Sequence, residues 1–299
     1  MTQGDASAGE LLVDTHVHLY RTPEEGSANK EAYVIWEYGE PKGVAFADHA
    51  GDYASAVAAL ESSGVRFAVV TNLFDVGRPG VPPAEDLVAY NRWLCDLART
   101  DQRFIPLIAV DPNHLLVAEN VAHLEEMARN HGAAGIKLHP PLQRLDLSTD
   151  ALFPILEACA SLDLVVLSHC GPTRDGSGIG EPESFRAVLS AFPTLRVVLA
   201  HMGGAAWRRL PPIAAAFPNV HFDLCEIIEW LGSPKAPTPE QMTALIREVG
   251  VERVMMGSDF PWYDPGHTIE QVRRLPGLSA SEQAAILGGN AARFFRLPA

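Results

Sequence analysis

Short apolar runs recur along the chain, and glycine, proline or polar residues follow each of them. Runs of this length and composition are typical of β-strands that are buried on both faces. Eight runs predict strands at about residues 11–18, 66–73, 104–111, 134–139, 163–169, 196–201, 219–225 and 253–259. The pattern therefore indicates a large, mostly parallel sheet.

Helical patterns lie between most of these strands. In the segments 152–159, 185–192 and 242–249, apolar residues follow the spacing i, i+3, i+4, i+7, which gives each helix one apolar face. Gly64 and Gly132 follow two other helical stretches, where a helix end is expected. Strands that alternate with helices indicate βαβ units, and eight units predict a single-domain (β/α)8 TIM barrel.

Two segments do not fit this repeat. Residues 1–10 are small and polar, and we expect a flexible tail before a barrel domain at 11–299. Residues 21–51 have no clear period and predict a long loop insertion after the first strand. Because active sites in TIM barrels lie where the strands end, Trp36 and Tyr38 in this loop are candidate lid residues over a substrate. The alternative is that these aromatic side chains pack on the barrel surface.

Composition narrows the class of protein. The 299 residues are 47% hydrophobic and 20% charged, which is typical of a folded globular chain. The net charge of −14 argues against nucleic acid or an anionic membrane as the main partner, and leaves a small-molecule substrate and a homodimer open.

The cellular compartment is predicted from two further features. No signal peptide and no apolar stretch of about 18 residues is evident. The four cysteines show no CxxC spacing, and they are Cys95, Cys159, Cys170 and Cys225. These features predict a cytoplasmic protein with free thiols.

The first strand carries the strongest chemical signal. His16 and His18 lie two residues apart near its end, so both imidazoles point to the same side of the strand. Imidazole is a common metal ligand, although such a pair alone also fits two structural histidines.

Three other predicted strands end in the same way. The runs LVVLSHCG, RVVLAHMGG and RVMMGSDFPW stop at His169, His201 and Asp259. In a barrel, the ends of parallel strands meet at one face, so these side chains would converge with the first-strand pair. Imidazoles and a carboxylate are donors that suit zinc or a similar divalent ion, such as manganese or iron, with a position left for water or substrate.

The motifs together resemble the amidohydrolase superfamily. The segments VDTHVHLY, GIKLHP, LSHCG, LAHMGG, GSDFPW and GGNAARFF carry the resemblance, which extends over about residues 11–297. They are most similar to the amidohydrolase-related branch, which includes aminocarboxymuconate-semialdehyde decarboxylase, resorcylate-type decarboxylases, lactonases and hydratases.

The resemblance implies roles for individual residues. His16, His18, His169 and Asp259 would be metal ligands, and Asp259 would also exchange protons with a bound water. His201 would lie near the substrate and assist catalysis rather than hold the metal.

Lys137 and His139 end the fourth predicted strand. In binuclear members of the superfamily, a lysine on this strand is carboxylated and bridges two metal ions. The branch that the chain resembles is mostly mononuclear, so one ion is favoured over two. A free Lys137 ammonium would then suit a substrate carboxylate, with a salt bridge in the barrel mouth as the structural alternative.

Residues in the loops after the strands are weaker candidates for substrate contacts. Arg174, Trp207 and Tyr263 lie in such loops, where specificity resides in TIM barrels. Asp223 ends the seventh predicted strand and is expected to hydrogen-bond a ligand histidine.

Three functions fit these observations. The first is a metal-dependent hydrolase of a small cyclic or carboxylated substrate, with Asp259 as base and His201 stabilising the oxyanion. The second is a nonoxidative decarboxylase in which Asp259 or His201 moves the proton. The third is a non-catalytic binding barrel, against which the retention of all five site groups argues. Hydrolysis is favoured because the wider superfamily is mostly hydrolytic.

Overall fold

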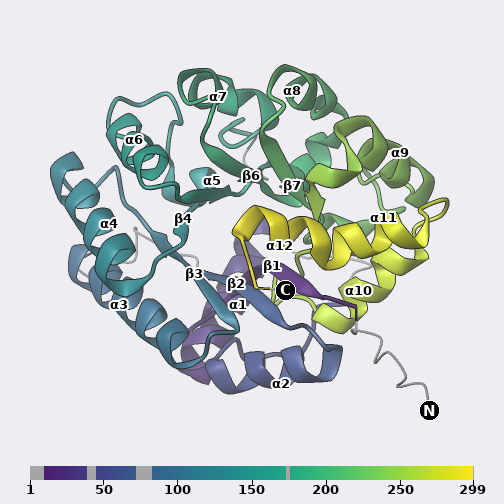
Figure 1. Ribbon diagram of the computed structural model, residues 1–299, viewed down its shortest axis with the longest axis horizontal. Coiled ribbons are helices and arrows are strands. Elements are labelled where there is room, and N and C mark those ends of the chain that lie inside the picture. Colours follow the sequence, from purple (N-terminus) through teal and green to yellow (C-terminus); the bar gives the residue numbers. More distant parts are fainter. Residues whose placement is uncertain (1–9, 39–44, 72–82, 173–175, 299) are drawn as a thin grey trace, which may run out of the picture.

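Eight parallel strands form the centre of the molecule, each paired with the next in the order of the chain (Figure 1). The computed structural model describes residues 10–38, 45–71, 83–172 and 176–298. The strands are β1 (Val13–His18), β2 (Phe67–Thr71), β3 (Phe104–Ala109), β4 (Gly135–Leu138), β5 (Val165–Ser168), β6 (Arg196–Leu199), β7 (Val220–Asp223) and β8 (Val254–Met255). All eight predicted strands are confirmed, although most are shorter than predicted.

The last strand returns to the first and closes the barrel. Val17 forms a parallel bridge with Phe260, which lies just beyond β8. Backbone N–H groups of Thr15 and Asp259 extend this seam, donating to Met256 O at 3.0 Å and to His16 O at 2.9 Å. The chain therefore folds as the predicted single-domain TIM barrel.

Helices surround the strands (Figure 1). The α-helices are α1 (Pro23–Tyr38), α2 (Tyr53–Ser63), α3 (Pro83–Thr100), α4 (Val117–His131), α5 (Pro140–Gln143), α6 (Phe153–Ser161), α7 (Arg186–Ala191), α8 (Pro211–Ala216), α9 (Pro239–Val249), α10 (Pro265–Arg274), α11 (Ala280–Ala284) and α12 (Asn290–Phe295). Further helical segments are η1 (Pro182–Phe185), η2 (Ala200–Arg209), η3 (Ile227–Trp230), η4 (Val251–Arg253) and η5 (Ala285–Gly289).

The predicted helix ends are confirmed at two glycines. Gly64 and Gly132 have φ angles of 76° and 78°, and each donates its N–H back to the helix that it ends. Glycine adopts this left-handed conformation without the steric penalty of a Cβ atom. The three segments with an apolar face are also helical, at α6, at η1 with α7, and at α9.

One end of the barrel is closed by apolar side chains. Ala291 and Phe294 of α12 pack with Val13, Phe67 and Leu107, which point into the barrel interior. Figure 1 shows α12 crossing in front of the strands at this end. Because Val13 begins β1 and His18 ends it, the functional side chains face the opposite end, the barrel mouth.

A β-bulge in β1 brings both histidines into the interior. The pairing of β1 with β2 shifts register between Asp14 and Val17, and an extra residue at a bulge reverses which side chains face inward. Asp14 stabilises this irregularity, since its Oδ1 accepts from the backbone N–H of His16 at 3.1 Å and of Ser258 at 2.9 Å. Burial raises the pKa of Asp14 to about 7.

The prediction of an irregular loop at 21–51 is wrong for its first half, which forms α1. The apolar period is absent because α1 leaves most of its side chains exposed and buries only small parts of its surface. Pro23, Glu24 and Glu25 in the first turn are residues typical of a helix start. Gly26 lets the helix approach the chain closely, because a Cβ there would lie 2.0 Å from Ala50 O.

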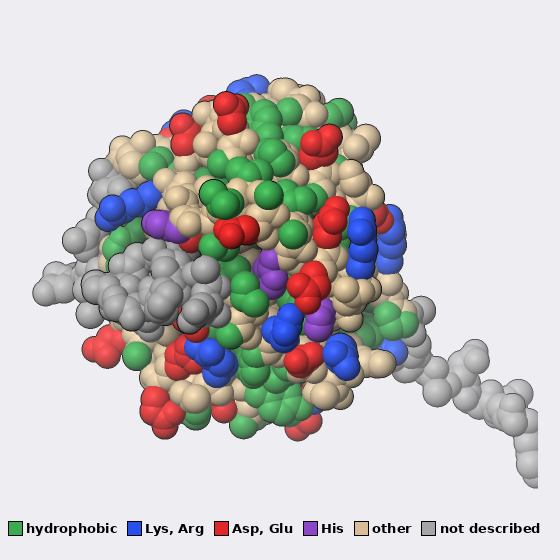
Figure 2. Space-filling model, turned by 90° about the vertical axis from the view of Figure 1, so that its left-hand side faces the viewer, with side chains coloured by type: hydrophobic (Ala, Val, Ile, Leu, Met, Phe, Trp, Pro, Cys, Tyr) green, Lys and Arg blue, Asp and Glu red, His purple; other side chains and the backbone are tan. Residues whose placement is uncertain are grey.

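Other features of the described residues agree with the composition. The four cysteines are buried and free. No helix in the described ranges is both long and apolar enough to cross a membrane. Figure 2 shows acidic and basic side chains interspersed over one face, without a broad basic region among the residues described there. The predicted tail at 1–10 lies almost wholly outside the described residues.

Candidate active site

Side chains from the C-terminal ends of several strands meet in one cavity at the barrel mouth. The cavity is lined by His16, His18, Tyr33, Lys137, His139, His201, Asp259 and Trp262. The space in it that a water molecule can reach is only about 10 Å³, far less than the roughly 300–1,000 Å³ of most ligand pockets. The structure is therefore in a closed state that leaves little room for a substrate.

His16, His18 and Asp259 form one of three buried groups of possible metal ligands among the described residues; the others are His16 with Asp223 and Cys225, and His201 with Cys225 and Asp259. Asp259 Oδ1 lies 3.0 Å from His18 Nε2 and 3.6 Å from His16 Nε2. All three side chains are buried. The carboxylate therefore stands between the two imidazoles that the sequence predicted as a pair.

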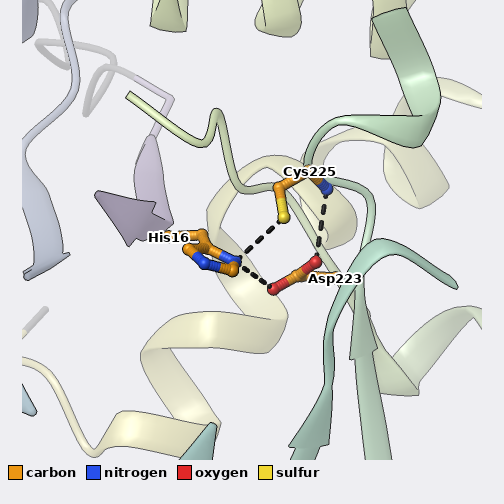
Figure 3. A group of neighbouring side chains, drawn as sticks. All are labelled: His16, Asp223 and Cys225. Atoms are coloured by element: carbon orange, nitrogen blue, oxygen red, sulfur yellow. Dashed lines mark hydrogen bonds and ion pairs between the residues drawn. The ribbon is translucent and has the colours of Figure 1, made fainter. Parts of the chain in front are cut away.

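The far nitrogen of His16 is held from β7 (Figure 3). Its Nδ1 lies 3.0 Å from Asp223 Oδ2 and 2.9 Å from Cys225 Sγ. Because a carboxylate oxygen only accepts hydrogen bonds, Nδ1 carries the ring proton. The unprotonated Nε2 then has a lone pair on the cavity side of the ring. The expected hydrogen bond between Asp223 and a histidine of the site is thus present.

Lys137 Nζ lies 2.6 Å from His16 Nε2. Burial lowers the pKa of Lys137, and it has the same effect on the pKa of His16. The ammonium donates to the nitrogen lone pair that an ion would use. Lys137 thus contacts a predicted metal ligand at the centre of the site.

His169 and His139 stack against each other, with ring centroids 4.2 Å apart. Neither ring nitrogen of His169 has a hydrogen-bond partner, although the side chain is buried. Burial lowers the pKa of His169 to about 3, so the imidazole is neutral. His169 also lies beside His201, with ring centroids 4.7 Å apart, but it belongs to none of the three groups of possible metal ligands.

His201 enters the cavity from the turn after β6. Its backbone N–H donates to Asp223 Oδ1 at 2.8 Å, so the same carboxylate orients His201 and His16. On the other side of its ring, Nδ1 lies 3.3 Å from Cys225 O and 3.4 Å from Glu226 Oε2. Burial lowers the pKa of His201 well below its usual value.

The residues at the mouth fit a divalent cation. Neutral imidazoles are the protonation state that binds a metal, and burial keeps the pKa of His18 low as well. Both nitrogens of His169 are buried without partners, and an unsatisfied buried polar atom is costly unless something binds it. His16, His18, His169 and Asp259 together offer the donor types that zinc, manganese and iron accept.

Unusual backbone conformations cluster around the same cavity. His201, Met202 and Asp259 have φ angles of 61°, 46° and 61°, and Glu226 has a φ of 62°. Such values are uncommon for residues with a side chain and are often found at functional sites. The turns after β6, β7 and β8 therefore hold conformations that local sequence preference does not favour.

Helix α1 lies directly over the cavity. The hydroxyl of Tyr33 lies 3.1 Å from His139 Nε2, and its ring contacts Trp262 with centroids 5.0 Å apart. Leu142 N donates to His139 Nδ1, so Nε2 carries the ring proton and donates to the Tyr33 hydroxyl. Trp36 lies farther out, 39% exposed, with its ring 6.1 Å from that of His139.

Trp207 and Tyr263 are not among the described residues that line the cavity. Trp207 donates through Nε1 to Lys235 O and stacks under the guanidinium of Arg208, in a separate surface groove. The Tyr263 hydroxyl accepts from Trp230 Nε1. Arg174 and the side chain of Tyr38 lie outside the described residues.

Comparison with known proteins identifies the family. A model of the amidohydrolase family matches residues 13–297. The chain belongs to the amidohydrolase family. A relative from Dictyostelium discoideum, named 2-amino-3-carboxymuconate-6-semialdehyde decarboxylase, is 27% identical over 198 residues, which are 56% of this amidohydrolase and 54% of the relative. The aligned part thus spans about half the length of that curated relative.

Solved structures share the fold of this amidohydrolase. The crystal structure of 5-carboxyvanillate decarboxylase from Sphingomonas paucimobilis matches with a TM-score of 0.70 at 19% identity, covering 97% of this chain and 100% of that one. The enzyme of the same name from Novosphingobium aromaticivorans matches with a TM-score of 0.71 at 16% identity, covering 97% of both chains. The latter is complexed with manganese and 4-hydroxy-3-methoxy-5-nitrobenzoic acid.

Several residues of this site were missed in the sequence. Cys225 follows Asp223 by two residues and could have been found by extending the strand-end argument to β7. Trp262 belongs to the quoted GSDFPW motif, but no role was assigned to it. Tyr33 gave no signal, because its place over the cavity depends on how α1 crosses the barrel mouth.

Proposed function

We propose that this chain is a metal-dependent, nonoxidative decarboxylase of a small aromatic or unsaturated carboxylic acid. The observation that carries the proposal is the Lys137 ammonium, buried in the same cavity as the metal-ligand candidates and in contact with a neutral imidazole. Such a cation is suited to pair with a substrate carboxylate. The names of the relatives support decarboxylation more than the hydrolysis that the sequence favoured.

His16, His18, His169 and Asp259 would hold one divalent ion, which when bound polarises substrate oxygens beside the bond that breaks. The small cavity favours a single ion and a free Lys137 over two ions bridged by a carboxylated lysine. Zinc, manganese and iron all fit the donor set. A small molecule is the expected partner of this site.

The reaction needs only the loss of CO₂ and the gain of a proton. The bond between the substrate carbon and its carboxylate breaks, the electron pair stays on that carbon, and a proton replaces the carboxylate. Asp259 or His201 supplies this proton. Burial raises the pKa of Asp259, which favours its protonated form compared with a solvent-exposed carboxylate.

We further propose that the segment 21–51 acts as a lid through α1. Tyr33 and Trp262 close the cavity from above in the present state, so a substrate enters only when α1 moves. A closed lid excludes water from the reacting carbon and thereby protects the carbanion-like transition state.

The proposal is tested by assaying the metal-loaded protein with 5-carboxyvanillate, 2-amino-3-carboxymuconate-6-semialdehyde and a set of lactones. Each reaction is run in ¹⁸O-labelled water, with and without a chelator. We expect one CO₂ for each acid consumed, no ¹⁸O in the organic product, and loss of activity with the chelator. Turnover of a lactone with ¹⁸O incorporation and no CO₂ would show a hydrolase instead.

A further inference from the structure

The chain turns sharply directly after β7, at Glu226. Its backbone has φ 62° and ψ −62°, and Ile227 N donates to Cys225 O across it at 2.6 Å. This combination is a γ-turn of the rare, strained form. A residue with a Cβ adopts it only when the surrounding structure imposes it.

Other left-handed residues of the described chain show how unusual this position is. Arg144 and Arg296 also have positive φ, but their ψ angles are 41° and 44° and both follow the end of a helix. That region is a recognised alternative for a residue at a helix end. Glu226 has ψ of the opposite sign, so the common explanation for a positive φ does not apply to it.

The turn directs the Glu226 carboxylate to His201. Glu226 Oε2 lies 3.4 Å from His201 Nδ1, and its side chain is only 17% exposed. The same nitrogen lies 3.3 Å from Cys225 O and 3.0 Å from Cys225 Sγ. Three groups of this turn therefore surround one ring nitrogen of the proposed proton carrier.

These groups favour different tautomers of His201. The Glu226 carboxylate and the Cys225 carbonyl accept hydrogen bonds only, so they favour a proton on Nδ1. The Cys225 thiol can donate, and it would then favour a bare Nδ1 with the proton on Nε2. The tautomer thus depends on whether the negative charge of Glu226 outweighs donation from the thiol.

We infer that Glu226 is a positioning residue that keeps the ring proton of His201 on Nδ1. Nε2, at the opposite edge of the ring, then has a free lone pair toward the cavity. It can accept a proton from a substrate hydroxyl or water and return it to the carbon that loses CO₂. This role rests on the proposed decarboxylation, but the tautomer itself can be measured without a substrate.

The first test is ¹⁵N NMR of the zinc-loaded protein with labelled histidine, in which the His201→Asn spectrum identifies the His201 signals. Wild type should show a protonated Nδ1 and a bare Nε2. Glu226→Gln keeps the shape of the side chain without its charge, and we expect a measurable population with the proton on Nε2. Cys225→Ala removes the competing donor and should retain the wild-type tautomer.

The second test is kinetic, on whichever acid of the panel the wild type decarboxylates. Glu226→Gln should lower kcat about 10-fold to 100-fold, at or below the roughly 10²–10⁴-fold that a proton-transfer group itself contributes, because Glu226 acts through His201. Its KM should change by less than about threefold and its metal content should stay the same, because binding and ligation are not affected. Glu229→Gln is the matched control: Glu229 is also buried, but it contacts His267 and Thr268, so His201 should be unaffected.

A third variant separates positioning from a purely structural role. Glu226→Gly permits the same backbone angles without strain, so its Tm should rise, by roughly 1–3 °C, while kcat falls as in Glu226→Gln. A residue kept only for stability would lose Tm instead.

The outcomes distinguish the two proposals. An unchanged tautomer in Glu226→Gln, or an unchanged kcat, overturns the role of Glu226 and leaves decarboxylation standing. Wild-type protein that releases no CO₂ from any acid overturns the proposed function, and the NMR result then decides the role of Glu226 alone.

Discussion

The two ends of the barrel are built from the same eight strands but bury opposite kinds of side chain. At the α12 end, Phe294 and Ala291 pack against Val13 and other apolar residues of the interior. At the mouth, the strands end in imidazoles, an ammonium and a carboxylate, several of which are buried and two of which leave ring nitrogens without partners.

This difference indicates where stability and function reside. Burying apolar area stabilises the fold by about 25 cal/mol per Å², whereas a buried polar group without a hydrogen bond is destabilising. The α12 end therefore supports the barrel, and the mouth is retained at some loss of stability. The bulge in β1 lies between the two ends of the barrel. Val13, before it, faces the apolar interior, while His16 and His18 face the cavity.

Removing a metal ligand from the mouth should have the largest effect. His16→Ala and His169→Ala each delete one donor, so the bound metal should fall well below one ion per chain and activity should fall to background. Elemental analysis after dialysis against metal-free buffer measures the bound metal, and CO₂ release measures the activity. Full metal occupancy in both variants would show that the ligands lie elsewhere.

A large substitution at the α12 end should change stability without changing chemistry. Phe294→Ala removes a buried ring from the closed end, and we expect a loss of about 3–5 kcal/mol in the free energy of unfolding. Denaturant unfolding measures this loss, and kcat and metal content at low temperature should stay close to wild type. A fall in kcat as large as the fall in stability would show that the two ends are coupled.

His201→Asn, at the mouth, should lower activity and leave metal binding intact. The variant loses a proton carrier but no proposed ligand, so we expect kcat to fall about 10²-fold or more with one ion still bound. Steady-state kinetics together with metal analysis checks both points. Loss of the ion with the activity would make His201 a ligand and would favour a binuclear site with Lys137.

Changes in the lid should have the smallest effects. Trp36→Ala and Tyr33→Phe alter contacts above the cavity, and Tyr38→Ala removes the other predicted lid residue. We expect KM to rise by a few-fold to about tenfold, about 1.4 kcal/mol, while metal content and Tm stay near wild type. Normal kinetic constants in all three variants would contradict a role for α1 in substrate binding.

The sequence was sufficient to predict the barrel and the convergence of the strand ends. Alternating apolar runs and amphipathic helices predict eight βα units, and parallel strands bring His16, His169 and Asp259 to one face whatever the details of the loops. The strand lengths were overestimated, because the chain leaves the sheet in tight turns, as at His201, before the apolar run is complete.

The remaining features depend on tertiary geometry. The bulge in β1 depends on Asp14 bonding to the backbone of Ser258, 244 residues away. Helix α1 has no apolar period, because only a few of its side chains meet the barrel. The approach of Glu226 to His201 depends on a backbone conformation that no local sequence pattern predicts.

The most direct measurement of the central claim is anomalous diffraction from crystals of the manganese-loaded protein. We predict one anomalous peak at the barrel mouth, at roughly 2.0–2.3 Å from nitrogens of His16, His18 and His169 and from a carboxylate oxygen of Asp259. The Lys137 ammonium should be displaced from His16 Nε2 in that crystal. A peak coordinated by other residues, or a mouth that binds no manganese at saturating concentration, would contradict the account.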